Sequence, residues 1–307
     1  MNLQGISFLV NKIPGKIFPG FLKIFNGLRL WCACSLVLTG NAVLAREYNI
    51  TDFGAVGDGV TNNTSAIQKA IDQCAETGKS IFPRWVFATG TLILKSNITI
   101  YLSENAILKG IADLSAYPRM KATNYRSYVD NYPDIALLFA ENRENIAITG
   151  SGTFYGNGDH QVFQDGIDNS RNRPFGIKMI QCRNVEVSNI KMQSSAFWMQ
   201  LYLACDKVRL TGLNIYNQSN MNNDGMNIDG CNDVIISNCF IDTSDDNICL
   251  KSTGLRMTQN VTVTNCILST HYYAFKCGTE SIDGFKNITV SNIVAKPSKA
   301  RLFPVNG

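Results

Sequence analysis

A phrase made of Asn, Asp or Lys, then Ile or Val, then alternating apolar residues, recurs along the chain. From Val185 onward its copies are separated by 23, 26, 27 and 27 residues. Each copy holds short β-branched runs between Asn, Gly, Ser and Asp, which is typical of strands separated by turns. Because one such unit cannot bury its apolar face alone, this period predicts stacked parallel coils. We therefore expect an all-β fold, a right-handed parallel β-helix. The copies are Asn145-Ile146, Asn184-Val185, Lys207-Val208, Asp233-Val234, Asn260-Val261 and Asn287-Ile288.

The N-terminal part of the repeat region has a different pattern. The turn-rich stretch Asp52–Gly59 precedes Thr64, which we expect to be the N-cap of a helix. The helix would carry Ile67, Ala70, Ile71 and Cys74 on one face. Since an open solenoid end exposes apolar core and unpaired strand edges, we interpret this helix as a cap.

The cysteines share the spacing of the repeat. Cys239 and Cys266 lie 27 residues apart, and Cys249 and Cys277 lie 28 apart. An equal phase predicts that the thiols of each pair stack inside the coil as small apolar groups. We expect free buried thiols, although stacked neighbours could be close enough to form disulfides.

Residues 1–45 have the layout of a secretory leader. They contain Lys12, Lys16, Lys23 and Arg29 and no acidic residue. An apolar run of residues 30–38 is followed by a short stretch with small residues that ends at Ala45, as at a signal-peptide cleavage site. This run is too short to span a bilayer, so we expect export with cleavage after Ala45 rather than a membrane anchor. Residues 46–307 would then form the β-helix domain, which we expect to be incomplete at its C-terminal end.

The charge of the remaining chain excludes some function classes. Removing the four basic leader residues from the 28 of the chain leaves 24 basic and 24 acidic residues. A balanced charge lacks the excess of basic residues that binding to nucleic acid or to an anionic membrane surface requires. His160 and His271 are the only histidines, which excludes a histidine-rich metal site.

Acidic residues are densest in two consecutive coils. Asp224 precedes Asp245 by 21 residues and Asp246 by 22, which is about one coil. One period returns the chain to nearly the same place on the solenoid wall, so the three carboxylates should converge. Like charges in such a cluster raise the pKa of at least one carboxyl group. Glycoside hydrolysis requires a protonated carboxylic acid beside ionised carboxylates, which such a cluster can supply. Asp and Asn are also turn residues, so the spacing by one coil is what favours catalysis.

These phrases resemble a known family. Asn222-Asn-Asp-Gly225 and Asp245-Asp246, with Asp52–Gly59 upstream, are similar to glycoside hydrolase family 28, the polygalacturonase and rhamnogalacturonan hydrolase family. The stretches Arg173-Pro-Phe175 and Phe197-Trp-Met-Gln200 resemble its bacterial branch. The resemblance implies an inverting mechanism with Asp245 as general acid and with Asp224 and Asp246 activating water.

Other residues are candidates for substrate contacts. Lys251 and Lys276 occupy equivalent phases of successive coils by our count, and either could pair with a uronate carboxylate. Trp198 and Tyr273 could stack on sugar faces, and Gln200 could bond a hydroxyl. Asn222, the first residue of its motif, and His271 complete the set.

The chain departs from the family pattern at several points. Tyr272-Tyr273-Ala274 stands where the family carries Gly-His-Gly, Asn227 stands for an Asp, and the expected Arg-Ile-Lys motif is absent near residue 301.

We expect a secreted, monomeric hydrolase of pectic polysaccharide that needs no metal or other cofactor. Two alternatives remain open. One is a polysaccharide lyase on the same scaffold, with Ca²⁺ held by the aspartates. The other is a β-helix that binds carbohydrate without turning it over, or an inactive remnant of such an enzyme.

Overall fold

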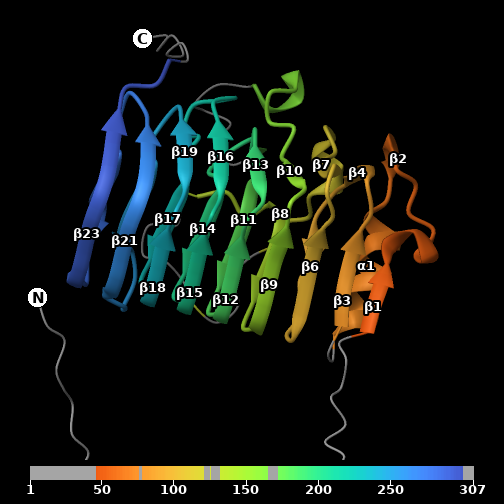
Figure 1. Ribbon diagram of the computed structural model, residues 1–307, viewed down its shortest axis with the longest axis horizontal. Helices are drawn as coiled ribbons and strands as arrows, with labels where there is room; N and C mark the ends of the chain where they lie inside the picture. The colour runs from red at the N-terminus through yellow and green to blue at the C-terminus, as the bar shows by residue number, and fades with distance from the viewer. Residues whose placement is uncertain (1–45, 76–77, 121–124, 126–131, 165–171, 300–307) are drawn as a thin grey trace, which may run out of the picture. The chain divides into compact units, whose positions relative to one another are not determined.

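The computed structural model describes residues 46–75, 78–120, 125, 132–164 and 172–299, and the predicted leader lies outside them. The described chain winds through successive coils, and all of its paired strands run parallel (Figure 1). This is the predicted right-handed parallel β-helix. Within the described residues, no helix is long and apolar enough to cross a membrane.

Three rows of strands form the walls of the coil. The first row contains β1 (Arg46–Asn49), β3 (Gly78–Phe82), β6 (Ile98–Leu102), β9 (Glu144–Gly150), β12 (Arg183–Ser188), β15 (Asp206–Thr211), β18 (Asn232–Ser237) and β21 (Thr258–Ser269). The second row contains β2 (Asp58–Asn62), β4 (Trp85–Thr89), β7 (Ala106–Gly110), β10 (Thr153–Tyr155), β13 (Lys191–Gln193), β16 (Asn214–Asn217) and β19 (Phe240–Thr243). It joins the first row at β21, and both halves of β21 pair with β23 (Phe285–Lys296).

The third row is a separate sheet. It contains β5 (Leu92–Ile93), β8 (Ala136–Glu141), β11 (Phe175–Ile180), β14 (Gln200–Leu203), β17 (Met226–Asp229), β20 (Ile248–Ser252) and β22 (Phe275–Ser281). Short 3-10 helices interrupt the turns at Ile50–Phe53, Leu114–Ala116 and Gln161–Phe163.

The residues that repeat along the sequence are paired with one another in successive strands of the first row. Val185 pairs with Val208, and the pairing continues through Val234 and Val261 to Ile288. The polar residue before each of them has a left-handed backbone, with φ near 54° at Asn184. Asn tolerates this conformation better than most residues, which explains why Asn opens so many of these strands.

The interior of the coil is filled by alternate residues of all three rows. Val208 and Val234 from the first row, Ile215 from the second and Ile228 from the third are buried in one continuous apolar cluster. Each fully buried aliphatic side chain of this kind contributes about 1.5–3 kcal/mol relative to an exposed one. The outward faces of the strands are therefore free to carry other chemistry.

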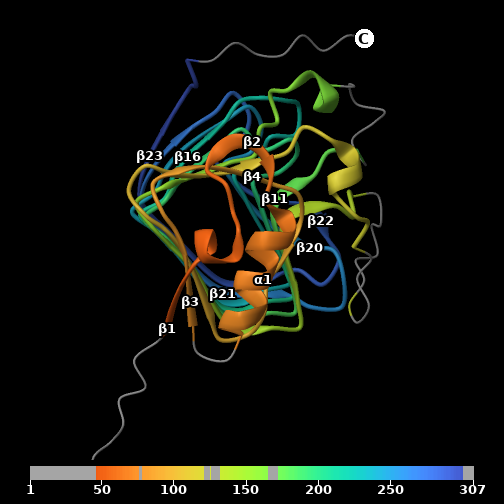
Figure 2. The same cartoon turned by 90° about the vertical axis from the view of Figure 1, so that its right-hand side faces the viewer.

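Helix α1 (Thr64–Cys74) covers the N-terminal end of the coil (Figure 2). Its apolar face, Ile67, Ala70, Ile71 and Cys74, is buried as predicted, and the helix packs against β1 and β3. The predicted N-cap is wrong by one residue. Thr64 is the first helical residue, and its hydroxyl accepts a hydrogen bond from the Gly90 amide (2.7 Å).

The thiols of all eight cysteines in the described chain are free. Cys239 and Cys266 are buried and stack as predicted, because Phe240 pairs with Ile267 in the adjacent coil. The stacking predicted for Cys249 and Cys277 is wrong. Cys249 pairs with Lys276, and Cys277 pairs with Leu250 and is exposed in the last coil. Because the loops between coils vary in length, a spacing of 28 residues does not bring Cys277 to the position that matches Cys249.

Candidate active site

The three predicted aspartates lie together just before the N-terminal ends of two neighbouring strands of the third sheet. Asp224 comes two residues before β17, and Asp245 and Asp246 come just before β20. Met226 pairs with Ile248, and the Gly225 amide donates to the Asp246 carbonyl (2.9 Å), so Asp224 and Asp246 occupy matching positions in adjacent coils. The predicted convergence of the three residues is confirmed.

Side-chain amides fix the backbone that carries Asp224. Asn217 at the end of β16 donates to the Asp224 carbonyl (2.9 Å) and accepts from the Ser195 amide (2.8 Å). Asn223 donates to the carbonyls of Ser195 (2.9 Å) and Phe197 (2.8 Å). The loop before β17 is therefore tied to the preceding coil.

Hydroxyl groups fix the second acidic loop in the same way. Thr243 and Thr270 each donate to the Asp245 carbonyl at 2.6 Å, and Asn247 donates to Thr243 (2.7 Å). The sequence analysis did not identify these residues, whose side chains bond the backbone of the two acidic loops. Their only signal was a surplus of Asn and Thr around the motifs, which turns would also explain.

Asp224 is only 4% exposed, and its carboxylate accepts a hydrogen bond from the Asn227 side chain (3.1 Å). Burial and the charges of Asp245 and Asp246 raise the pKa of Asp224 well above its ordinary value. The Asn227 bond acts against this rise because it stabilises the ionised form. An amide at position 227 thus assists ionisation of Asp224 where a carboxylate would oppose it.

Asp245 is less buried than its two neighbours and has the most open position of the three. Burial and the charge of Asp246 raise the pKa of Asp245, while a hydrogen bond from the Asp246 amide (3.0 Å) acts in the opposite direction. A raised pKa keeps a carboxylic acid protonated further toward neutral pH, as a proton donor requires.

Asp246 forms an ion pair with Lys276 of β22. The Lys276 ammonium lies 2.9 Å from one Asp246 oxygen, and the other oxygen is buried without a hydrogen-bond partner among the described residues. Burial disfavours the charged form of Lys276, but the hydrogen bond and charge of Asp246 outweigh it, so the pKa of Lys276 is raised. The cluster therefore combines three carboxylates with one directly bonded cation.

Lys251 is held in a different network. Its ammonium lies 2.7 Å from Glu280, which also accepts a hydrogen bond from the Tyr132 hydroxyl (2.8 Å). The same ammonium lies 5.1 Å from the centre of the Trp198 ring. The side chain of Lys251 is only 6% exposed, so its charge is already matched and covered.

The predicted equivalence of the two lysines is wrong. Lys251 pairs with Asp229 of β17, whereas Lys276 pairs with Cys249. A register shift in the pairing of β20 with β22, between Leu250 and Ser252, adds to the unequal loop lengths. The two ammonium groups therefore serve separate carboxylates.

The remaining predicted contact residues divide by exposure. Tyr273 is 57% exposed, and its ring centre lies 5.1 Å from the Lys276 ammonium. His271 lies in the same loop and is exposed. Tyr273, beside the cation that bonds Asp246, can face a substrate lying along the aspartates.

The other predicted contact residues make their contacts within the protein. Trp198 is buried in an aromatic cluster with Phe175, Phe197 and Tyr132. Asn222 accepts a hydrogen bond from Arg173 (3.1 Å). Gln200 is fully buried and bonds Met192 and Tyr202 inside the coil, so the prediction of a substrate contact for Gln200 is wrong.

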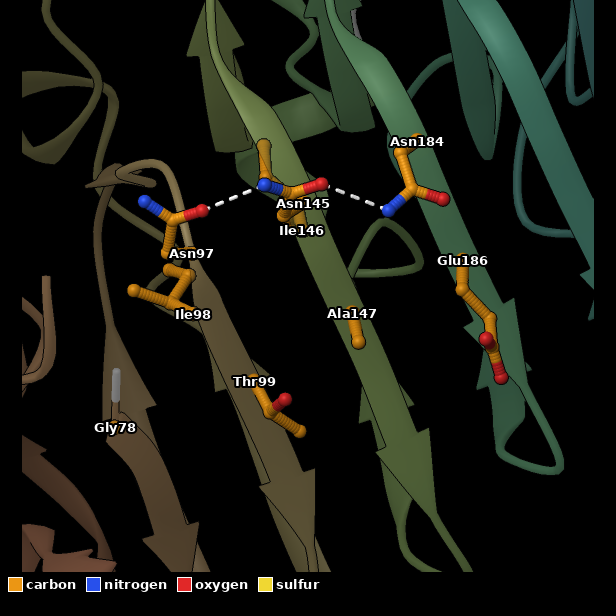
Figure 3. A pocket seen from close by; sticks show the side chains of 9 residues that line it. All are labelled: Gly78, Asn97, Ile98, Thr99, Asn145, Ile146, Ala147, Asn184 and Glu186. Atoms are coloured by element: carbon orange, nitrogen blue, oxygen red, sulfur yellow. Dashed lines mark hydrogen bonds between the residues drawn. The ribbon is translucent and has the colours of Figure 1, made fainter. Parts of the chain in front are cut away.

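The residues that the structure describes contain no group of three or more His, Cys, Asp or Glu side chains arranged to hold a metal ion. A separate hollow lies on the first row of strands, where Asn97, Asn145 and Asn184 form a ladder of side-chain hydrogen bonds of 2.6 and 2.8 Å (Figure 3). These amides sit at left-handed turns and bond one another from coil to coil. We interpret this hollow as part of the scaffold.

Known proteins resemble this chain in sequence and in fold. A probable polygalacturonase of Vitis vinifera is 28% identical over 83% of the chain and 56% of its own length. An exo-poly-alpha-D-galacturonosidase of Dickeya chrysanthemi is 29% identical over 69% of the chain and 43% of its own length. The chain thus spans about half the length of these curated relatives.

The same family appears among solved structures. The exopolygalacturonase of Thermotoga maritima superposes with a TM-score of 0.72 at 25% identity, covering 82% of this chain and 68% of that one. The sequence profile of "Glycosyl hydrolases family 28" matches residues 94–301, which include all three aspartates. The chain therefore belongs to glycosyl hydrolases family 28.

Proposed function

We propose that this protein is an inverting glycoside hydrolase that cleaves galacturonate-containing pectic polysaccharide. The observation that carries the proposal is the cluster of Asp224, Asp245 and Asp246 in adjacent coils, with the pKa of Asp224 and of Asp245 raised. The family, and the galacturonate polymers named for its Vitis and Dickeya relatives, support the choice of substrate.

The roles follow from the chemistry of inversion. One carboxylic acid protonates the glycosidic oxygen while ionised carboxylates activate a water on the opposite face of the sugar. The pKa of Asp224 is raised as well, so exposure is what separates the two: Asp245 is the most open of the three and is suited to be the acid. Asp224 and Asp246 lie at matching positions in adjacent coils and are suited to hold the water between them.

We infer from the sequence that residues 1–45 direct export and that cleavage follows Ala45. We also infer that the mature protein acts as a monomer. Expression in a host with an export pathway, followed by N-terminal sequencing and size-exclusion chromatography with light scattering, tests both inferences. An unprocessed intracellular product would contradict the first, and a stable dimer the second.

The central experiment measures new reducing ends from polygalacturonate and from rhamnogalacturonan, with EDTA present, for the full chain and for Asp245→Asn. Release by the wild type alone supports a hydrolase with Asp245 as acid and identifies the polymer that is cut. Products carrying an unsaturated sugar would point to a lyase. Binding of oligogalacturonide by a folded wild type that releases no reducing ends would contradict the proposal and favour a carbohydrate-binding β-helix.

A further inference from the structure

We propose that Lys276 is a positioning residue that supplies the compensating positive charge of the aspartate cluster and orients Asp246, instead of binding a uronate carboxylate of the substrate. This inference rests on the proposed hydrolase function and assigns a role to one residue of the same site. It replaces the expectation from the sequence, in which Lys276 faced the substrate as a free cation.

The geometry holds Lys276 from two sides. Its ammonium bonds Asp246 at 2.9 Å and lies 5.1 Å from the centre of the Tyr273 ring. The Asp246 side chain is 5% exposed and that of Lys276 is 26% exposed, so the pair is largely removed from solvent. Turning toward a substrate would leave a buried carboxylate without its cation, which is strongly unfavourable.

Lys251 acts on Asp224 and Asp245 through its charge alone, because its ammonium is bonded to Glu280 at 2.7 Å and makes no ion pair with the cluster. Lys276 is therefore the cation that bonds directly to the cluster among the described residues. The charged and titratable groups around it come from three consecutive coils and their loops: Asp224, Asp245, Asp246, Cys249, Lys251, Tyr273 and Glu280.

The charge of Lys276 has a measurable consequence. Burial and Asp246 raise the pKa of Asp245, and Lys276 is among the groups that act against this rise. Removing the lysine charge therefore raises the pKa of Asp245 further. The pH profile of kcat/KM should move to higher pH, since its limbs report the essential acid and base of the free enzyme.

The experiment compares the full chain with Lys276→Met, Lys276→Gln and Lys276→Arg on polygalacturonate across pH 3.5–8. We expect both neutral variants to lose at least about tenfold in kcat/KM at the wild-type optimum, and their optimum to rise by about one pH unit. Lys276→Arg keeps the charge and should keep the profile. Lys191→Met, a loss of an exposed lysine on β13, is the matched control and should change neither.

A lysine that binds substrate gives a different result: KM rises in both neutral variants while the pH optimum stays at its wild-type value. That outcome, or an unchanged profile with lower kcat, overturns the inference.

A second readout is independent of activity, so a wild type without turnover would contradict the proposed function alone. Circular dichroism should show folded variants whose Tm falls more between pH 4.5 and pH 7.5 than that of the wild type. An equal fall in wild type and neutral variants overturns the inference.

Discussion

Asp245 combines partial exposure with a raised pKa, which is what a proton donor needs to reach a glycosidic oxygen and still hold its proton. We expect Asp245→Asn to lower kcat by about 10²–10⁴-fold, because the amide cannot donate an acidic proton. The Tm should change little, since the carbonyl bonds from Thr243 and Thr270 use the backbone of Asp245 and remain.

The reducing-end assay and thermal melting check this prediction together. Asp233→Asn is the matched control, because it makes the same change at an exposed turn where the left-handed backbone accepts Asn. Asp233→Asn should retain wild-type kcat. Turnover by Asp245→Asn at the wild-type rate would refute the assignment of the acid.

Gly225 follows Asp224 directly and allows two adjacent coils to approach. A Cβ atom there would contact the Asn247 carbonyl oxygen closer than van der Waals packing allows, with the Ile241 side chain at 3.0 Å. We expect Gly225→Ala to lower the free energy of unfolding by about 1–3 kcal/mol. Because the clash separates the two acidic loops, kcat should fall as well. Urea denaturation and the reducing-end assay measure the two effects, and loss of neither would contradict the packing described here.

At the scale of elements, α1 protects the first coils. Ile71, on the inner face of α1, is fully buried, so Ile71→Ala should lower the free energy of unfolding by about 2–5 kcal/mol. Coils of a solenoid contact mainly their neighbours, so the damage should be local. Hydrogen exchange should show β1 and β3 opening first while β17 and β20 stay protected. Gln73→Ala, on the exposed side of α1, is the control and should behave as wild type. Uniform loss of protection in Ile71→Ala would show a single cooperative unit instead.

The stacked thiols of Cys239 and Cys266 belong to the core of the second row. The neighbouring thiol of Cys239 lowers the pKa of Cys266 to about 7, although burial opposes this. We expect Cys239→Ala to cost about 1 kcal/mol of stability and to leave kcat unchanged. Cys277→Ala, at an exposed thiol, should cost nothing measurable. A wild-type Tm that falls on adding a reductant would point to a disulfide and contradict the free thiols.

The accuracy of sequence reasoning varied between elements for a physical reason. The valines of the first row could be aligned because consecutive strands pair in register, so the period of the sequence is the period of the coil. The same arithmetic predicted that Asp224 would meet Asp246. It failed for Cys249 and Lys251, because the loops between coils differ in length and break the period before β22 begins.

Contacts between coils were also beyond prediction. Lys276 bonds Asp246, thirty residues away, and Glu280 bonds both Lys251 and Tyr132. Pairings of this kind depend on side-chain direction at the outer face of the third sheet, which composition and spacing do not specify. Gln200 was assigned to the wrong side for the same reason.

At the scale of the whole molecule, the site works against the stability of the solenoid that holds it. Burial raises the pKa of Asp224, Asp229 and Asp245 in the folded state, so the fold resists their ionisation. The folded state then binds protons more tightly than the unfolded chain at these groups. Their contribution to stability is fully present below the unfolded pKa of about 3.9 and is lost as the pH rises through the folded pKa.

This sign gives a prediction for the double variant Asp224→Asn/Asp245→Asn, which removes two of the three carboxylates. Its Tm should exceed that of the wild type by about 2–4 °C at pH 8, because the wild type then holds repelling charges in a buried cluster. The difference should shrink as the pH falls toward 4, because the raised pKa of Asp224 and of Asp245 lets these carboxyls take up protons in the folded state. Asp233→Asn, at an exposed turn, should show no pH-dependent difference from the wild type. Differential scanning calorimetry across pH 4–8 measures this, and a double variant that melts below the wild type at pH 8 would show that the carboxylates stabilise the coil through bonds not accounted for by their charge.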